Sequence, residues 1–535
     1  DYRSLWLLLG ITGLVLLIAC ANLANLMLVR ASAREREMAV RLVLGAPRWR
    51  LIQQLLSEGV LLAGSGAILG IGLAGILSRS LVLLFSTAEN VPLLDQLRMD
   101  WRVLSFVAAV ATLTCILFAL APAFRSSGRH PGAALRAGSR GTTADRSRFS
   151  LQRVMVVVQV SVSLVLLVGA LLFVRSFRNL VRLNPGMRER GITVAFLGYW
   201  QSPLPPERWA DFQRELLEEV QSVPGVLSAA TTTRVPLDGG SWEHGVRVSS
   251  KVGMSKFTWV SPDYFATMDI PVVKGRGFTK QDTASSPRVA LVNQTFVRRF
   301  LGDTNPVGQT LLTSPEPDYP ATTYEIVGII PDTRYNDLRT ETPPMTFAPA
   351  TQFPGQGPWC HVIIYSSVPP ATVMAAVKRR LAESHPDVVA EFGDFQKRVL
   401  DGLVMERVMA MLSGFFGVLA AALAAVGLYG VISYIVAMRR NEIGIRIALG
   451  ASRSSVVTLV LRQTVLLLAI GVVIGVVLAL AAARSADSLL YGLRPNDPGA
   501  MLGASVLLAA VALVASFAPA RRASRLDPVV ALRYE

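Results

Sequence analysis

Seven long apolar stretches restrict this chain to one class of fold. Each has few charges and is long enough for a helix to cross the hydrocarbon core of a bilayer, which takes about 20 residues. They cover residues 5–29, 55–85, 103–124, 153–175, 407–437, 456–483 and 499–518. Buried helices of a large soluble core are the alternative, but the chain is 52% hydrophobic and only 17% charged, which does not suit a soluble protein. We predict an α-helical membrane protein with about seven spans.

Arginine is concentrated in four segments, and this predicts the orientation of the spans. Segments 30–52, 125–153, 439–453 and 521–535 together hold 21 arginines and six acidic residues. Loops 86–102 and 484–498 are close to neutral. Because positively charged loops stay in the cytoplasm, the four segments are expected inside, and the two loops and about 176–406 outside. The net charge of +16 is therefore a topology signal, with anionic lipid as a secondary contact, and it does not call for nucleic acid.

The outer segment between the fourth and fifth spans has the pattern of an α+β domain. Two strand, helix, strand units are expected, and each helix is opened by proline. The first comprises 192–200, a helix from 205–207 carrying Trp209, Phe212, Leu216 and Val220, and 226–233; the second comprises 361–365, 370–384 and 388–392. Between them, at about 245–350, short alternating segments such as 289–292 and 324–330 indicate strands. We predict two βαβ halves flanking a β-rich insertion.

The membrane part contains an internal repeat. Residues 37–48 align without a gap on 442–453, an offset of 405, and the register continues from Gly66 and Gly70 to Gly471 and Gly475. A second match at an offset of 397 pairs Ala121-Pro122-Ala123 and Ala134-Leu135-Arg136 with Ala518-Pro519-Ala520 and Ala531-Leu532-Arg533. One three-span module is therefore present twice, in parallel orientation.

The repeat and the composition shifts set the expected domain boundaries. They are a first three-span module at 1–125, a cytoplasmic linker rich in Gly, Ser and Arg at 126–150, one span at 151–176, the outer domain at 177–405, a second three-span module at 406–520 and a cytoplasmic tail at 521–535.

These motifs together resemble the MacB/FtsX-type ABC transporter permeases. The cytoplasmic box at 442–451 and the closing segment 518–533 carry the resemblance in the membrane part. In the outer domain it is carried by Ser261-Pro262-Asp263-Tyr264-Phe265, Gly275-Arg276-Gly277-Phe278, Asp282, Val292-Asn293, Phe296, Pro306-Val307-Gly308 and Glu325-Ile326-Val327-Gly328. Tyr264, Phe265 and Phe278 are expected in the core, and Gly275 and Gly328 at turns.

The resemblance implies one complete permease unit and part of another. Residues 151–535 look like a whole unit, and residues 1–125 look like the second half of a further unit, in an arrangement similar to the duplicated permeases of acidobacteria. The chain begins at Asp1 within a hydrophobic run, so we expect a fragment of a longer protein. The resemblance also implies a multi-pass protein of the bacterial cytoplasmic (inner) membrane, with its large domain in the periplasm.

In such permeases the segment after the first span of each three-span module contacts the ATPase, so the resemblance implies two docking segments here. Their candidate residues are Arg34, Glu37, Arg41, Gly45 and Arg48 in the first copy and Arg439, Glu442, Arg446, Gly450 and Arg453 in the second. Met38, Val40, Leu42, Leu44 and their equivalents are expected against lipid or neighbouring helices. An interfacial anchor that only sets topology is the alternative. Arg440 is matched by Glu35 and Asn441 by Arg36, so docking is expected to be asymmetric.

Small and amide residues within the spans suggest contacts between helices. Gly66, Gly70, Gly471 and Gly475 form two Gly-x-x-x-Gly faces that allow close packing, with a hinge as the alternative. Asn22 and Asn25 can line a polar path or make interhelical hydrogen bonds, and the second is the expectation.

Enzyme functions fit the sequence poorly. It has no Gly-x-x-x-x-Gly-Lys-Ser/Thr motif for ATP. The four histidines, His130, His244, His361 and His385, lack metal-ligand spacing, and Cys360 and His361 are expected on opposite faces of a strand. Cys20 and Cys115 lie in spans, so no disulfide is expected. We therefore predict no catalytic, cofactor or metal site, and an energy source in a separate polypeptide.

The predicted function is a permease subunit of an ABC transporter that transmits ATP-driven movement from a separate ATPase to the periplasmic domain, for export or efflux. The expected partners are that ATPase, the lipid bilayer and a periplasmic adaptor, and the two boxes would make one chain pseudo-dimeric. A transmembrane regulator that activates a periplasmic partner without moving cargo stays open as the alternative. A secondary transporter is disfavoured because the repeat is parallel and charges within the spans are scarce.

Overall fold

The computed structural model divides the chain into two units. It describes residues 2–33, 48–85, 101, 105, 106, 109, 143–238, 240, 242–317, 319–353, 355, 357–485, 491–493 and 496–525. The membrane unit comprises residues up to Phe177 and from Glu406 onward, and the second unit comprises Arg178–Met405. The expected outer domain, 177–405, corresponds to the second unit.

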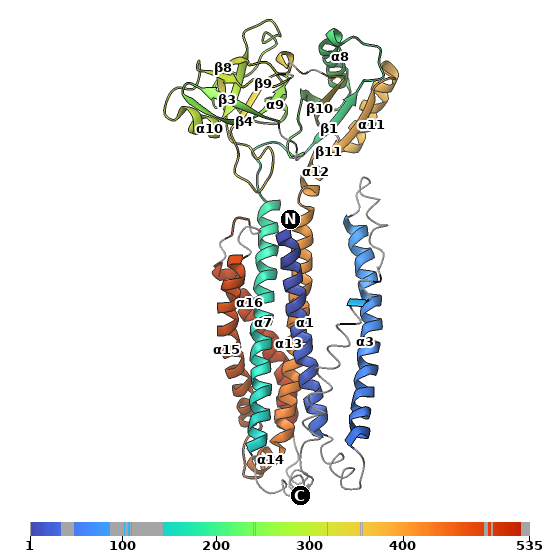
Figure 1. Cartoon of the computed structure of the whole chain (residues 1–535), viewed down its shortest axis with the longest axis vertical. Helices are drawn as coiled ribbons and strands as arrows, with labels where there is room; N and C mark the ends of the chain where they lie inside the picture. The colour runs from blue at the N-terminus through green and yellow to red at the C-terminus, as the bar shows by residue number, and fades with distance from the viewer. Residues whose placement is uncertain are drawn as a thin grey trace. The chain divides into compact units, whose positions relative to one another are not determined.

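The membrane unit consists of long helices and one short one (Figure 1). The helices are α1 (Tyr2–Ala33), α3 (Arg48–Phe85), α7 (Thr143–Val181), α13 (Val404–Met438), α14 (Arg440–Ala448), α15 (Arg453–Ser485) and α16 (Pro498–Ala523). Of these, α1, α7, α13, α15 and α16 are long and apolar enough within the described residues to cross a membrane. The predicted span 55–85 lies within α3, and the predicted span 103–124 lies almost entirely outside the described residues.

Two predicted boundaries differ from the structure. Helix α7 begins at Thr143, inside the segment predicted to be a linker, because no Gly or Pro interrupts the sequence between Gly141 and Gly169. Helix α16 continues through Pro519 to Ala523, beyond the predicted end of the span at 518. A proline removes one backbone hydrogen bond from a helix, and the flanking turns continue past it here. The rest of the predicted linker, 126–142, lies outside the described residues.

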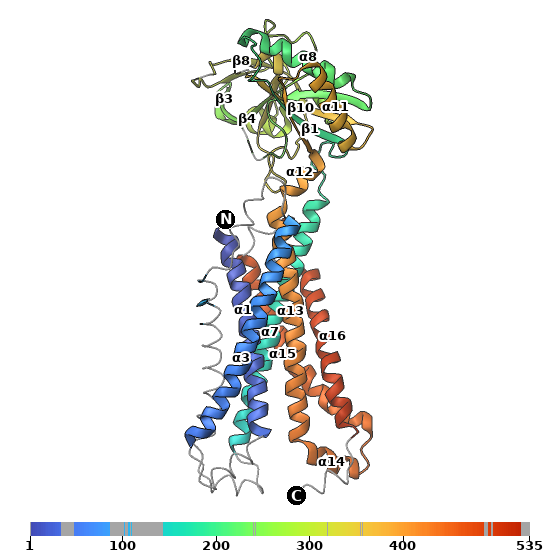
Figure 2. The same ribbon diagram turned by 90° about the vertical axis from the view of Figure 1, so that its right-hand side faces the viewer.

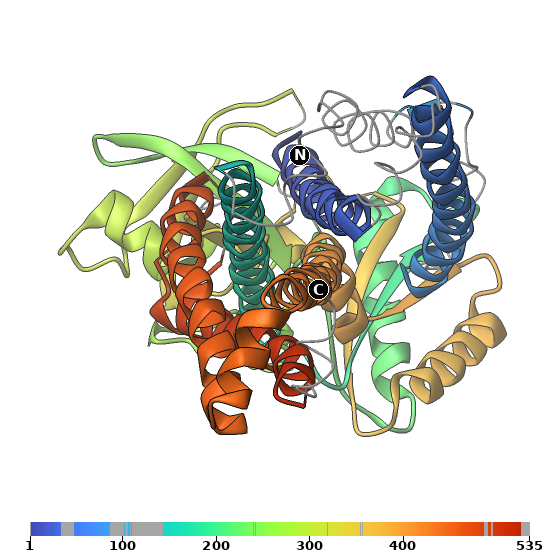
Figure 3. The same ribbon diagram turned by 90° about the horizontal axis from the view of Figure 1, so that it is seen from below.

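The core of the membrane unit forms where α7 contacts α13, α15 and α16. Its buried side chains include Val160 and Leu164 of α7, Leu428 of α13, Leu468 of α15 and Leu508 of α16. Small residues line the facing helices, so their backbones approach closely. Ser161 of α7 donates a hydrogen bond to the Gly471 carbonyl across 2.9 Å. Figure 3, a view along the helices, shows α1, α7 and α13 next to one another.

The second unit begins and ends with two interleaved βαβ units. The first is β1 (Ile192–Gly198), α8 (Trp209–Ser222) and β2 (Val226–Thr232), and the second is β10 (Trp359–Ser366), α11 (Pro370–Ser384) and β11 (Val389–Asp394). The strand order is β11-β1-β10-β2, with β1 antiparallel to both β10 and β11. Each unit therefore places one of its strands between the two strands of the other. Phe212, Leu216 and Val220 of α8 are buried, as their helical spacing predicts.

The insertion between these units is a β-barrel. Its strands are β3 (Trp242–Val248), β4 (Lys251–Val260), β6 (Val289–Asn293), β7 (Thr310–Thr313), β8 (Thr323–Ile330) and β9 (Met345–Pro349). They pair in the order β4-β3-β7-β8-β6-β9, and a parallel pairing of β9 with β4 closes the ring. Closure leaves no free edge among these strands. Trp259, Phe257, Phe296 and Tyr324 belong to the core of this barrel, and Figure 2 shows it beside the helices α8 and α11.

The residues that carry the family resemblance in this unit have structural roles. Tyr264, Phe265 and Phe278 are buried, as predicted. The prediction of turns for Gly275 and Gly328 is wrong: they lie opposite each other in the pairing of β5 (Lys274–Gly275) with β8. Gly275 has a φ of +83°, which disfavours other residues, and a Cβ on Gly328 would lie 2.6 Å from the Arg276 carbonyl oxygen.

An ion pair holds the loop after β5. Both Arg276 terminal nitrogens donate to Asp282, each across 3.0 Å, and the Thr279 backbone N–H donates to the same carboxylate. Burial alone would raise the pKa of Asp282, but these hydrogen bonds outweigh it and lower the pKa below its usual value. Asp282 is 7% exposed, so the carboxylate is a structural element of the loop.

Candidate functional site

The second cytoplasmic box forms the short helix α14 between two spans. A Schellman motif ends it: the Ala451 N–H donates to the Arg446 carbonyl across 2.9 Å, and the Gly450 N–H donates to the Ile447 carbonyl across 3.0 Å. Gly450 has a φ of +93°, which this motif requires at that position. In this copy, the end of α14 therefore accounts for the glycine that both boxes share.

Helix α14 has one packed face and one exposed face. Ile443 is buried with Val456 of α15 and Ala523 of α16, and Ile447 packs against the same cluster. Ile445 is 48% exposed and Leu449 is 83% exposed. Residues three and four apart share a helix face, so Ile445 and Leu449 lie with Glu442 and Arg446 on the side away from the bundle. We call these four residues the docking face.

Charged groups on the docking face are paired. Arg446 Nη2 lies 2.7 Å from Glu442 Oε1, and Arg439 Nε lies 3.8 Å from Glu442 Oε2. Exposed pairs of this kind add little stability, but they hold the side chains in defined positions. The docking face therefore carries a positive group, a negative group and two exposed apolar side chains.

The other candidate docking residues are only partly described. Arg453 begins α15, and Arg48 begins α3. Arg34, Glu37, Arg41 and Gly45 lie outside the described residues, as do Met38, Val40, Leu42 and Leu44 and the side chain of Arg48. The docking role of these residues stays a prediction.

The two predicted glycine faces differ in the structure. A Cβ on Gly471 would lie 2.6 Å from Val160 Cγ1, and one on Gly475 would lie 3.0 Å from Leu164 Cβ. These glycines therefore allow α15 to pack closely on α7. On Gly66 and Gly70 a Cβ would meet nothing within 4 Å among the described residues.

Asn22 makes the interhelical hydrogen bond that the sequence predicts. Its Nδ2 donates to the Leu423 carbonyl of α13 across 2.7 Å. Gln159 of α7 donates to the same oxygen across 2.8 Å. The side chain of Asn25 lies outside the described residues.

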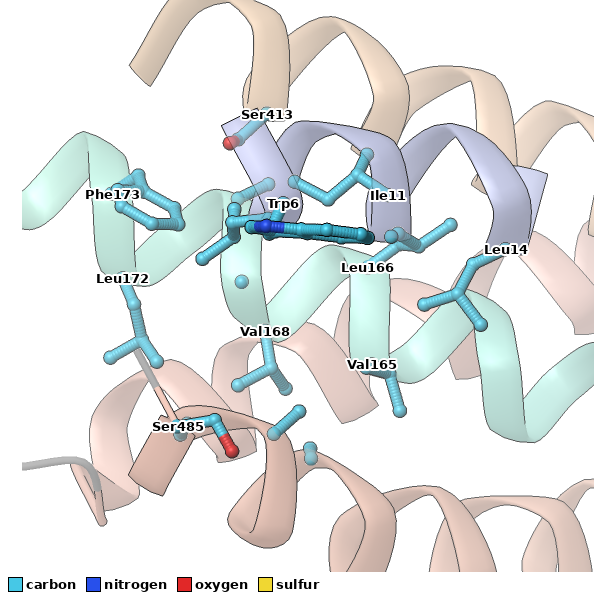
Figure 4. A pocket seen from close by; sticks show the side chains of 17 residues that line it. Trp6, Ile11, Leu14, Val165, Leu166, Val168, Leu172, Phe173, Ser413 and Ser485 are labelled. Carbon is cyan, nitrogen blue, oxygen red and sulfur yellow. The ribbon is translucent and has the colours of Figure 1, made fainter. Parts of the chain in front are cut away.

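An apolar cavity of about 570 Å³ lies within the membrane unit between α1, α7, α13 and α15. Figure 4 shows the Trp6 indole lying between Phe173 and Leu166, with Ser413 on one side and Val168 on the other. The cavity is lined mainly by aliphatic and aromatic side chains, and its volume is in the range of small-molecule sites. Such a lining suits an apolar group.

Ser413 is the polar feature of this cavity with no partner. It is 3% exposed, and its hydroxyl makes no hydrogen bond within the described part of the chain. An unsatisfied buried hydroxyl lowers stability, so an occupant with a hydrogen-bonding group would be favoured here.

Sequence reasoning missed the cavity. It placed the apolar residues of the box against lipid or neighbouring helices, and Ile443 and Ile447 do pack against neighbouring helices. Ile445 and Leu449 are instead exposed. The spacing of Ile445 and Leu449 relative to Glu442 and Arg446 was a usable signal, because all four fall on one helical face. The cavity had no comparable signal, since its lining comes from helices far apart in the sequence.

Comparison with family models covers most of the chain. The FtsX-like permease C-terminal model matches residues 9–131 and again 414–528. The MacB-like periplasmic core domain model matches residues 154–384. By their descriptions, the first model is a permease domain and the second a periplasmic domain.

Similar proteins are exporters by name. The macrolide export ATP-binding/permease protein MacB of Marinobacter nauticus is 26% identical over 332 residues, which cover 59% of this chain and 48% of that protein. The pyoverdine export ATP-binding/permease protein PvdT of Pseudomonas entomophila is 31% identical over 286 residues, which cover 50% of this chain and 41% of that protein. The chain thus spans less than half the length of either relative.

A solved structure of a periplasmic region is among those similar to parts of this chain. The periplasmic region of MacB from Actinobacillus actinomycetemcomitans aligns with 41% of this chain and 97% of that structure, at 13% identity and a TM-score of 0.30. The family assignment depends on the two family models and the exporter relatives. The chain is a membrane-spanning protein of the MacB/FtsX-type ABC transporter permeases, and it carries the FtsX-like membrane module twice, with one MacB-like periplasmic core domain between the copies.

Proposed function

We propose that this chain is the permease subunit of an ABC exporter and transmits movement from a separate ATPase to its periplasmic domain. The ATPase binds in the cytoplasm at the docking face of α14 and at the equivalent segment of the first module. The protein resides in the bacterial inner membrane, and a periplasmic adaptor or partner receives the movement on the other side. The two boxes make one chain a pseudo-dimeric permease.

The docking face is the observation that carries this proposal. Ile443 and Ile447 attach α14 to the ends of α15 and α16, so a push on the exposed side passes to the spans. The Schellman motif at Gly450 fixes the end of α14. Exposed Ile445 and Leu449, next to the ion pair of Glu442 and Arg446, combine apolar and charged groups as protein interfaces do.

Two spans suit the transmission of movement because they lead by chain connection into the periplasmic domain. Helix α7 enters that domain and α13 leaves it. They pack tightly: a Cβ on Gly417 of α13 would lie 2.8 Å from the Ala170 Cβ of α7. The Ser163 hydroxyl of α7 also donates to the Ala420 carbonyl across 3.3 Å. A close-packed pair moves as one body more readily than two separate helices.

The test is copurification of a tagged chain with ABC ATPases of the host, identified by mass spectrometry. Arg446→Glu and Leu449→Asp change the docking face. Arg484→Glu makes the same charge change on an exposed residue at the other end of α15 and is the matched control. We expect both docking-face variants to lose most of the ATPase, and the control to retain it.

A second readout concerns activity. The copurified complex in lipid vesicles should hydrolyse ATP, and the docking-face variants should lose this activity in proportion to the lost ATPase. Equal recovery of the ATPase with Arg446→Glu, Leu449→Asp and the unmodified chain would overturn the proposal.

A further inference from the structure

The repeat register and the packing of α1 on α13 coincide. At the offset of 405, the following positions are equivalent: Val15 and Ala420, Ile18 and Leu423, Asn22 and Gly427. The first two pairs belong to one apolar cluster, in which Ile18 and Ala420 are fully buried. The third pair is joined by direct contact, because a Cβ on Gly427 would collide with Asn22 Oδ1. Equivalent positions of the two copies therefore lie in the same contact region, and one pair, Asn22 and Gly427, is in direct contact.

This arrangement is the one expected of a two-fold interface. When two copies pair about a two-fold axis, the same patch of each copy faces its own equivalent. Helices α1 and α13 run in the same direction in Figures 1 and 2 and lie side by side in Figure 3. The contact positions are spaced by three and then four residues in both helices, as in the seam between two parallel helices.

The seam is not symmetric in its side chains. Asn22 fills the space above Gly427 from one side, and Gln159 of α7 fills it from the other, since a Cβ on Gly427 would also lie 2.6 Å from Gln159 Nε2. Both amides donate to the Leu423 carbonyl. Asn22 is 6% exposed and Gln159 is 1% exposed. An asparagine at this position of one helix therefore fits only if the equivalent residue of the other helix is glycine.

This polar contact has a cost that apolar packing would avoid. Asn22 Oδ1 and Gln159 Oε1 accept no hydrogen bond in the part of the chain that the structure describes. Unsatisfied buried acceptors lower stability. A single buried asparagine in a helical seam is a known way to select a partner and a register at the expense of stability.

We propose that α1 and α13 form the pseudo-two-fold seam of the permease, and that Asn22 against Gly427 selects the first module as the partner of the second. A seam of two α13 helices from different chains would place glycine opposite glycine. It would leave the Leu423 carbonyl without the hydrogen bond from Asn22 and a void where Asn22 now packs. The inference rests on the proposed pseudo-dimeric permease but concerns only the pairing of modules.

Disulfide cross-linking of the full chain in membranes tests the pairing. The native cysteines are replaced by alanine, Val15→Cys and Ala420→Cys are introduced, and a protease site is inserted between residues 126 and 142. Cross-linking is induced without ATP, and the chain is then cleaved. We expect the two fragments of one chain to stay joined until the disulfide is reduced. We expect no product in which the disulfide joins two separate chains. Predominance of a product of two chains, or separation of the fragments without reduction, would overturn the proposal.

Variants of the seam test the selection. Asn22→Gly makes both positions glycine, and we expect the product of two chains to increase severalfold. Gly427→Ala should reduce the intrachain cross-link severalfold, and Asn22→Ala in the same chain should restore part of it. Gly414→Ala is the matched control on α13, because a Cβ there would only touch Val174 at 4.0 Å. No change in either product with Asn22→Gly and Gly427→Ala would overturn the selection.

The cross-linking result is independent of ATPase docking. If the docking-face variants of α14 retain the ATPase while the intrachain cross-link forms, the proposed coupling fails and the seam stands. If the docking-face variants lose the ATPase while the product of two chains predominates, the seam fails and the coupling stands.

Discussion

Gly471 of α15 lies directly against Val160 of α7. A Cβ at Gly471 would come within 2.8 Å of Val160 Cβ and within 3.2 Å of the Val157 carbonyl oxygen. Gly475, one turn later, repeats the contact with Leu164 and the Ser161 carbonyl. The Ser161 hydroxyl bonds the Gly471 carbonyl in the same region. The backbones of α7 and α15 are thus in contact along two turns.

The first prediction follows from this contact. We expect Gly471→Ala to destabilise the membrane unit by about 1–3 kcal/mol, because the added methyl group overpacks the contact between α7 and α15. Gly66→Ala, at the equivalent position of the first copy, is expected to be neutral or to stabilise α3 by up to about 1 kcal/mol through helix propensity. Thermal unfolding of the two variants in detergent gives the comparison. A loss for Gly66→Ala as large as that for Gly471→Ala would contradict it.

The second prediction concerns pH and the periplasmic unit. Burial lowers the pKa of His361 to about 4 from 6.5. The nearby Asp238 carboxylate opposes this shift, and the positive charges of Arg398 and Arg234 add to it. The unfolded chain therefore takes up this proton first as the pH falls. Stability contributed by neutral His361 is present above about pH 6.5 and is lost as the pH falls towards 4.

His361→Phe should remove this part of the pH dependence, since the ring packs 5.2 Å from Phe196 and 5.6 Å from Trp359, measured between centroids. Melting temperatures of the chain and the variant, followed by tryptophan fluorescence between pH 7 and pH 4.5, provide the measurement. An unchanged slope of melting temperature against pH in the variant would refute the assignment to His361.

Local patterns in the sequence predicted local structure well. The helix 370–384 is confirmed with the same bounds as α11, because Pro370 opens it and apolar residues recur at helical spacing. Cys360 and His361 alternate as a strand requires: Cys360 packs under α8 and α11, and His361 contacts Phe196 and Trp359 on the other side of the sheet. These features depend on neighbours in the sequence, and the period of the side chains reveals them.

Local sequence patterns do not predict which distant segments pair with one another. The sequence patterns indicate two strand, helix, strand units, but they do not indicate that β10 lies between β1 and β2. The local pattern around Gly275 indicates a turn, and it cannot reveal the pairing of Gly275 with Gly328 in β8. The box at 442–453 is visible in the sequence as one copy of a repeat. Its division into a packed face with Ile443 and an exposed face with Leu449 depends on where α15 and α16 lie.

A third prediction tests the terminus of α14. Gly450→Ala places a side chain at a φ of +93°, which costs about 1–2 kcal/mol for a residue with a Cβ. Gly450→Asn tolerates this conformation better and is the matched variant. Hydrogen exchange of peptides covering 440–453 should become several-fold faster in Gly450→Ala than in Gly450→Asn. Equal exchange in both variants would show that the Schellman motif does not hold the docking face.

The last prediction separates two roles of Asp497 at the start of α16. Its carboxylate accepts hydrogen bonds from the backbone N–H groups of Gly499 and Ala500 across 2.7 and 3.1 Å, and it lies 3.0 Å from Arg175 Nη1. Asp497→Ala removes both the cap and the ion pair, whereas Asp497→Ser keeps a capping oxygen and removes only the ion pair. We expect a loss of about 1 kcal/mol for alanine and a much smaller loss for serine.

Serine is expected to cost less stability than alanine because the ion pair is exposed. Arg175 is 44% exposed, and such pairs contribute about 0–1 kcal/mol, while the cap satisfies two N–H groups that have no partner within the helix. Hydrogen exchange at residues 499–503 reports on the first turn directly, and Arg175→Gln provides the complementary removal of the ion pair. If serine and Arg175→Gln accelerate exchange as much as alanine does, the ion pair and not the cap secures the beginning of α16.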